Sequence, residues 1–123
     1  MARGLGAGLV ASLLQLLAAT TGAGAHAFLD RAEPRVGGKV HTAPVRVTLW
    51  FTERLEPAYS RVKVVDEAGR QVDKADGAVD ASDPRVLGAS LTPLAPGTYK
   101  VIWRVLSVDT HVTEGDFTFS VAR

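Results

Sequence analysis

Two sulfur-containing residues are nearly missing from this sequence of 123 residues, which has no cysteine and a single methionine, Met1. A chain without cysteine forms no disulfide bonds, so its fold must be held by its apolar core. It also offers no thiolate to a metal ion, and Met1 lies in a segment that we expect to be removed. Any metal site in the mature chain must therefore be built from nitrogen and oxygen ligands.

An excess of charge of one sign is also missing. The sequence has 14 Lys and Arg against 13 Asp and Glu, and Arg3 is the only charged residue among the first 25. The rest of the chain is therefore balanced, with both signs interspersed. This distribution gives no electrostatic footprint for nucleic acid or for an anionic membrane, so neither is predicted as a partner.

No apolar run is long enough to span a membrane comfortably. The run at 5–19 is interrupted by Ser12 and Gln15, and it follows the positive charge of Arg3. The sequence Ala-Gly-Ala at 23–25 fits the recognition site of a signal peptidase. We therefore predict a signal peptide at 1–25, cleaved after Ala25, and one periplasmic or secreted domain at 26–123 that is not embedded in a membrane. The alternative, an N-terminal core helix, fits the cleavage pattern less well.

Sustained helical periodicity is absent, and short alternating segments take its place. At 45–51 and 99–105 every second residue is apolar, which is typical of half-buried strands. Further strands are predicted at 61–66, 86–91 and 117–121, with a turn at 67–70, a loop at 73–83 and a turn at 93–97. This spacing predicts an all-β fold, a small antiparallel β-sandwich with little helix. The aromatic side chains expected to fill its core, one of which could wall a metal site, are Trp50, Tyr99 and Trp103.

Cleavage after Ala25 would make His26 the first residue of the mature chain. A free α-amine and the imidazole Nδ1 of one residue can close a chelate ring on a metal ion. The alternative is that the peptidase merely tolerates histidine at this position. His26 alone does not decide between the two.

Asp109 and His111 follow the longest predicted strand. Residues two apart in extended backbone point to the same side, so a carboxylate and an imidazole would converge there. The alternative is a polar turn in which Asp109 caps backbone amides and His111 is solvated. With His26, these residues offer two imidazoles, an amine and an oxygen, a set that favours Cu(II) over other divalent first-row ions. Without sulfur ligands, the bound copper is expected to stay oxidised.

Four segments carry a further signal in their order along the chain: His26–Leu29 (HAFL), Leu49–Glu53 (LWFTE), Leu94–Trp103 (LAPGTYKVIW) and Ser107–His111 (SVDTH). Together they resemble the CopC family of periplasmic copper-binding proteins over essentially the whole mature chain. The resemblance implies a Greek-key, immunoglobulin-like β-sandwich with one Cu(II) per mature chain. The residues that match the family's copper site are His26, Asp109 and His111, with Glu53 beside them.

The role implied for Glu53 is a hydrogen bond that orients a copper ligand or the amine. Its alternative is an ordinary solvated side chain beside Arg54. His41 matches no motif and is expected to be exposed and outside the site. Some CopC proteins also carry a methionine-rich Cu(I) site, which this sequence lacks, so it resembles the form with a single Cu(II) site.

The resemblance implies a role in copper homeostasis and no enzymatic activity. A protein of this type would carry or buffer copper, in uptake or in resistance, and deliver it to a CopD-like membrane importer or to another extracytoplasmic protein. We expect it to be a monomer.

Two other functions use the same residues differently. An N-terminal histidine chelating copper on a β-sandwich also resembles the lytic polysaccharide monooxygenases, which are oxidative enzymes. The small size, the lack of an evident aromatic platform for a polysaccharide, and Asp109 at a position that oxygen chemistry needs open argue against this alternative. The third function is a metal-free adhesion or interaction module, which failure to bind copper would favour.

Overall fold

The fold of residues 26–123, the part of the chain that this computed structural model describes, is all-β. The predicted signal peptide at 1–25 and its cleavage after Ala25 lie outside the described residues. The elements are β1 (Leu29–Glu33), β2 (Lys39–Val40), β3 (Arg46–Phe51), the 3-10 turn η1 (Pro57–Tyr59), β4 (Arg61–Val65), β5 (Ala78–Val79), β6 (Val86–Ser90), β7 (Gly97–Leu106) and β8 (Val112–Val121).

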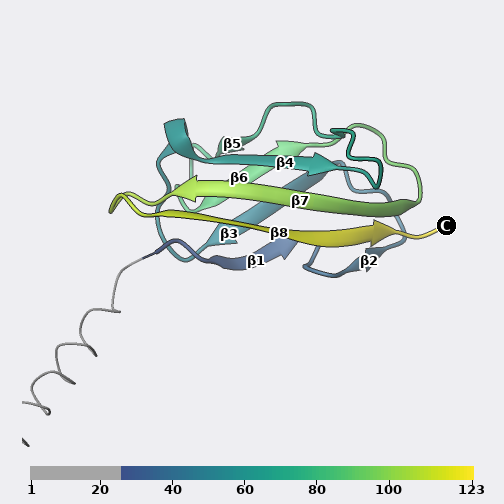
Figure 1. Cartoon of the computed structure of the whole chain (residues 1–123), viewed down its shortest axis with the longest axis horizontal. Coiled ribbons are helices and arrows are strands. Elements are labelled where there is room, and N and C mark those ends of the chain that lie inside the picture. The colour runs from purple at the N-terminus through teal and green to yellow at the C-terminus, as the bar shows by residue number, and fades with distance from the viewer. Residues whose placement is uncertain (1–25) are drawn as a thin grey trace, which may run out of the picture.

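The strands form two four-stranded sheets that pack face to face (Figure 1). One sheet has the order β1-β3-β6-β5 and the other β2-β8-β7-β4, so the chain crosses repeatedly between them. The predicted β-sandwich is confirmed. It departs from a fully antiparallel arrangement at one place, because the short strand β2 runs parallel to β8. In the described part of the chain, no helix is long and apolar enough to cross a membrane.

The core lies between the sheets, where the alternating apolar faces meet as predicted. The buried residues of β3 are Val47, Leu49 and Phe51; those of β7 are Tyr99, Val101, Trp103 and Val105; those of β8 are Phe117, Phe119 and Val121. Each large side chain buried in this way contributes roughly 1.5–3 kcal/mol to stability. Because these faces come from both sheets, they hold the sandwich together without a covalent link.

Two residues were placed wrongly from the sequence, Val45 by the alternation and Trp50 by its aromatic type. Val45 is 80% exposed and precedes β3, so it does not belong to the apolar face expected at 45–51. Trp50 lies on the outer face of its sheet, half-buried, with the guanidinium carbon of Arg31 3.6 Å from its ring centroid. A cation above the ring compensates for this position, because the π face of indole attracts it.

Three short strands were missed. β1 has a mostly exposed, charged sequence, and a bulge at Asp30 shifts its register against β3. β2 and β5 have only two residues each, and β5 lies inside the stretch predicted as the loop at 73–83. All three are edge strands, which depend on backbone hydrogen bonds to a neighbour rather than on an apolar face of their own.

A buried carboxylate organises the connection that follows β4. Asp73 is 7% exposed and accepts hydrogen bonds from the backbone N–H of Val64 (2.7 Å) and Ala75 (3.0 Å) and from the amide of Gln71 (2.9 Å). Val65 and Gln71 pair across the turn, as the hairpin predicted there requires. The carboxylate thus satisfies backbone groups that would otherwise be buried without partners.

Replacing Gly115 by Ala should destabilise the domain by about 1–3 kcal/mol, because overpacking a rigid site forces neighbours out of their rotamers. A Cβ at this position would lie 2.7 Å from Cζ2 of Trp103, whose ring meets Phe51 edge-on in the core. Urea unfolding at constant m value measures the change. The cost should shrink in a Trp103→Phe background, where the ring is smaller; an equal cost in both backgrounds would contradict this explanation.

Candidate metal centre

The first described residues run from one end of the sandwich into β1 and are held on both sides. Thr52 N donates to Phe28 O (2.9 Å), and Phe28 N donates to Thr52 Oγ1 (3.0 Å), whose hydroxyl donates to His26 O (3.3 Å). From the other sheet, the hydroxyl of Thr113 donates to Ala27 O (2.6 Å). Ala27 itself is fully buried. Two threonines and a small buried side chain therefore fix where His26 lies.

The loop between β7 and β8 occupies the same end of the molecule (Figure 1). Ser107 N donates to His111 O (3.0 Å) and Thr110 N donates to Ser107 O (2.9 Å), which closes a tight turn. Thr110 has φ +72°, a left-handed conformation that costs a β-branched residue about 1–3 kcal/mol. Asp109 and His111 therefore converge through this turn. The extended backbone predicted from the sequence is not what brings them together.

The structure brings three of the predicted site residues together. The ring centroids of His26 and His111 are 4.4 Å apart, with 58° between the ring planes. Nδ1 of His111 lies 3.3 Å from Oδ1 of Asp109. The side chains of Asp109 and His111 are 37% and 46% exposed, so the cluster opens to solvent.

The carboxylate of Asp109 is held in its ionised form. A hydrogen bond from the hydroxyl of Ser107 lowers the pKa of Asp109 below its usual value. Desolvation opposes this shift, and a hydrogen bond and the charge of His111 lower the pKa further. A hydrogen bond lowers the pKa in this way because it stabilises the charged form. The centre therefore presents an anionic oxygen beside two imidazoles.

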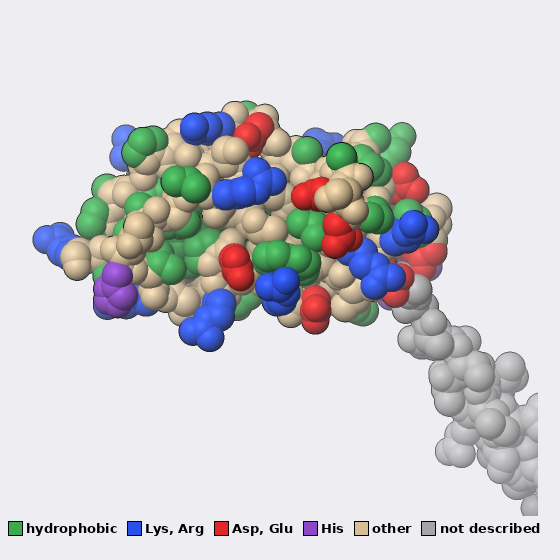
Figure 2. All heavy atoms as spheres, turned by 180° about the vertical axis from the view of Figure 1, so that it is seen from behind, with side chains coloured by type: hydrophobic (Ala, Val, Ile, Leu, Met, Phe, Trp, Pro, Cys, Tyr) green, Lys and Arg blue, Asp and Glu red, His purple; other side chains and the backbone are tan. Residues whose placement is uncertain are grey.

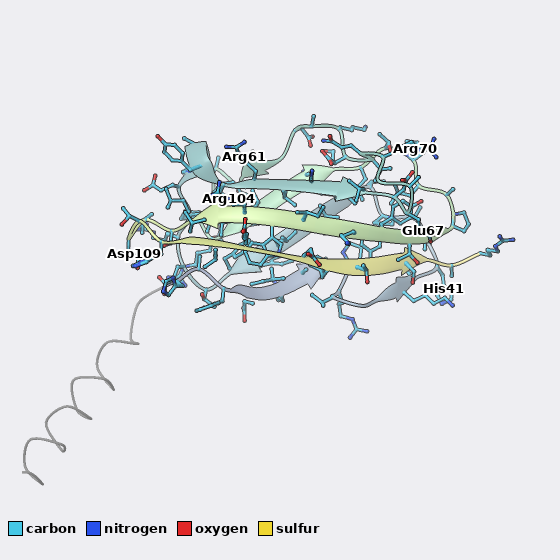
Figure 3. The ribbon with its side chains drawn as sticks, viewed as in Figure 1. His41, Arg61, Glu67, Arg70, Arg104 and Asp109 are labelled. Atoms are coloured by element: carbon cyan, nitrogen blue, oxygen red, sulfur yellow. The ribbon has the colours of Figure 1, made fainter. Side chains whose placement is uncertain are left out.

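Two other residues, Glu53 and His41, were also considered from the sequence. Glu53 follows β3 and is half-buried, and its side chain makes no hydrogen bond or ion pair within residues 26–123. His41 is exposed, as predicted, and lies at the end of the sandwich opposite Asp109 (Figure 3). The role of Glu53 beside the metal stays a prediction.

The donors in this cluster suit Cu(II), which favours imidazole nitrogen and carboxylate oxygen in a tetragonal arrangement. Within residues 26–123, no group of three or more His, Cys, Asp or Glu side chains is placed to hold a metal ion by itself. If the predicted cleavage after Ala25 takes place, the free α-amine of His26 would add a further nitrogen donor to this cluster.

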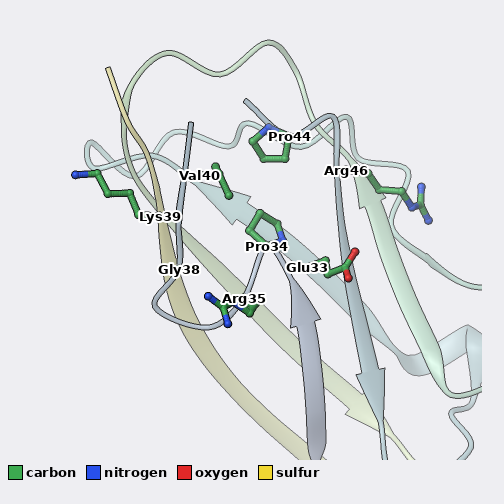
Figure 4. A pocket seen from close by; sticks show the side chains of 8 residues that line it. All are labelled: Glu33, Pro34, Arg35, Gly38, Lys39, Val40, Pro44 and Arg46. Atoms are coloured by element: carbon green, nitrogen blue, oxygen red, sulfur yellow. The ribbon is translucent and has the colours of Figure 1, made fainter. Parts of the chain in front are cut away.

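The surface away from the candidate metal centre carries charged side chains and one hollow. On the face seen from behind, basic and acidic side chains are mixed over the middle and the right, while the left end shows basic side chains and no acidic ones (Figure 2). A hollow of about 470 Å³ lies between the end of β1 and the β2 segment, with cations of Arg35, Lys39 and Arg46 around it (Figure 4). None of the predicted metal ligands lines this hollow, so it is separate from the candidate centre.

Sequence reasoning missed the residues that support the centre. Ser107 appeared only as the first letter of SVDTH and Thr52 only as the fourth letter of LWFTE, while Thr113 is an ordinary residue of β8. Their hydroxyls matter because of what the fold places beside them, and only the spacing of Ser107 from Asp109 and His111 carried any signal.

Fold and site together define a small β-sandwich with a cluster of nitrogen and oxygen donors at one end, and relatives of the same kind are known. Residues 29–122 match the family model described as the CopC domain. The chain is 37% identical over 98 residues to protein YobA of Escherichia coli K12, with 79% of each chain covered. It is 36% identical over 103 residues to copper resistance protein C of Pseudomonas syringae pv. tomato, with 79% and 81% covered. The chain belongs to the CopC family.

A solved structure agrees with the assignment to this family. The crystal structure of CopC from Methylosinus trichosporium OB3b is similar with a TM-score of 0.70 and 38% sequence identity, and the match covers 79% of this chain and 94% of that one. The predicted family and the predicted sandwich are therefore both confirmed.

Replacing Thr113 by Val should release the N-terminal segment, because the isosteric side chain cannot donate to the buried carbonyl of Ala27. An acceptor left unsatisfied in this way costs about 1–3 kcal/mol. Amide hydrogen exchange of the metal-free protein starting at His26 should become faster at residues 27–29. Thr118→Val, on the exposed face of the same strand, is the control. Unchanged exchange in the Thr113 variant would show that the hydroxyl does not hold the segment.

Proposed function

We propose that the chain, after cleavage behind Ala25, binds one Cu(II) ion at His26, Asp109 and His111 and serves copper homeostasis outside the cytoplasm. The observation that carries the proposal is the meeting of His26 and His111, with ring centroids 4.4 Å apart and Asp109 beside His111. The name of the Pseudomonas relative, copper resistance protein C, supports copper as the metal.

Each residue has a distinct task in this proposal. His26 supplies its α-amine and its imidazole Nδ1, which form a chelate ring. His111 supplies a second imidazole, and Asp109 supplies a carboxylate oxygen. Cu(II) prefers such a nitrogen and oxygen set, and the absence of cysteine and of methionine beyond Met1 leaves no soft ligand for Cu(I). Glu53 remains the proposed carboxylate that orients the amine or a ligand.

An open site suits a carrier or buffer better than an enzyme. Because Asp109 and His111 are more than a third exposed, a partner's ligands can reach the metal and exchange with them. We propose a periplasmic or secreted monomer without catalytic activity. Its partner would be a CopD-like membrane importer or another extracytoplasmic copper protein.

Adding one Gly before His26 should weaken Cu(II) binding strongly and change the electron paramagnetic resonance spectrum. The extension turns the α-amine into an amide, which has no basic lone pair, so the chelate ring is lost. The comparison uses two purified proteins, one starting at His26 and one with the leading Gly, titrated against the same competitor. Equal affinities and spectra would refute the N-terminal chelate.

Replacing His111 by Ala should strongly weaken Cu(II) binding, because a ligand itself is lost. The loss should exceed the roughly 10–100-fold that follows when only a residue hydrogen-bonded to a ligand is removed. The fold should persist, because this side chain is exposed and contributes little to the core. His41→Ala is the matched control, since this histidine lies at the opposite end of the sandwich. If His111→Ala binds copper like the parent, His111 is not a ligand. If the variant unfolds without first losing affinity for copper, His111 has a structural role.

A further inference from the structure

Ser107 is the one fully buried polar side chain at the metal end of the described chain. It is 0% exposed and lies directly after β7, where the chain leaves the sheet. A buried hydroxyl is costly unless it is hydrogen-bonded, so its partners indicate what it does. All of its side-chain partners belong to two residues, Asp109 and His111.

The hydroxyl of Ser107 and the imidazole of His111 both contact the same oxygen of Asp109. The Ser107 hydroxyl donates to Oδ1 of Asp109, and Nδ1 of His111 lies 3.3 Å from that oxygen. The backbone N–H of His111 donates to Ser107 Oγ (3.3 Å). A buried hydroxyl thus fixes both the carboxylate and the backbone of the histidine that follows it.

This arrangement determines which oxygen of the carboxylate remains for a metal. Oδ1 of Asp109 accepts from the Ser107 hydroxyl, and Oδ2 has no hydrogen-bond partner within residues 26–123. Oδ2 is therefore the oxygen that the loop leaves for an external ligand.

We propose that Ser107 is a positioning residue of the copper centre, which anchors Oδ1 of Asp109 so that Oδ2 is presented to the metal. The inference rests on the copper site proposed above and extends it to a residue that does not touch the metal. Carboxylates that bind metals are commonly held by hydrogen bonds themselves, and the loss of such a partner lowers the affinity for the metal. Here the partner is a hydroxyl inside the protein, shielded from competing water.

A purely structural role for Ser107 predicts a different pattern of effects. The backbone bond from Ser107 N to His111 O (3.0 Å) closes the turn without the hydroxyl, and an alanine would keep it. The hydroxyl is therefore not required to form the loop. Its loss should alter the orientation of Asp109 and His111 more than the stability of the hairpin.

Ser107→Ala should lower Cu(II) affinity by about 10–100-fold and shift the electron paramagnetic resonance parameters. The matched control is Ser60→Ala, because Ser60 is also buried, at 4% exposure, but its hydroxyl accepts only from Leu106 N (3.2 Å). The control should bind copper like the parent. If Ser107→Ala also binds like the parent, with an unchanged spectrum, Ser107 does not position the site.

A double-mutant cycle separates positioning from general damage. In an Asp109→Ala background the Ser107→Ala change should have no further effect on copper affinity, because the residue through which it acts is gone. The same loss of affinity in both backgrounds would overturn the proposal and leave Ser107 a structural role.

Carbon-13 spectra of the Asp109 carboxyl group in the metal-free protein test the same idea without copper. Ser107→Ala should shift this signal at neutral pH, because the hydroxyl that donates to Oδ1 is lost, and Ser60→Ala should leave it unchanged. An unchanged signal in Ser107→Ala would overturn the proposal. If the signal shifts but the parent binds no copper, the copper function fails while the role of Ser107 in anchoring Asp109 stands.

Discussion

The pairing of β7 with β8 is the interaction on which the rest of this structure depends. Ten residues of each strand are in register, from Gly97 opposite Val121 to Leu106 opposite Val112. A slip of one residue would turn every buried side chain of this hairpin outward, so the apolar faces lock the register. The locked register places Ser107 opposite His111 and forces the short turn that presents Asp109. The core thereby fixes the geometry of an exposed polar cluster.

The second half of the cluster reaches the same place by another route. His26 belongs to the segment before β1, which pairs with β3 in the opposite sheet. Thr52 holds this segment from the β3 side and Thr113 from the β8 side. The candidate centre therefore lies across the two sheets, with one imidazole from each, and its geometry depends on how the sheets pack.

The lack of sulfur ligands and the solvent exposure of the cluster both fit the proposed carrier role. With only imidazole, amine and carboxylate available, the chemistry favours an oxidised, divalent copper ion. Asp109 and His111 are also partly exposed, as the proposed exchange of copper with a partner protein would require. Both properties fit the carrier role proposed for this member of the CopC family.

Much of the fold could be predicted because the inner strands carry their own signal. In β3 and β7 apolar residues alternate with polar ones, since each of these strands buries one face. β1, β2 and β5 could not be predicted in the same way, because edge strands are defined by the neighbour that pairs with them. Trp50 was expected in the core because it is a large aromatic residue, although it lies on the outer face of its sheet beneath Arg31.

The sequence by itself determined which donors the candidate site can contain, and that no sulfur is among them. It named His26, Asp109 and His111, because their residue types and positions carry the chemistry. Only the tertiary structure decided that these residues meet, that the turn at Thr110 brings two of them together, and that Ser107 lies buried beneath them. Proximity between residues far apart in the chain arises from strand register and sheet packing, which no local pattern contains.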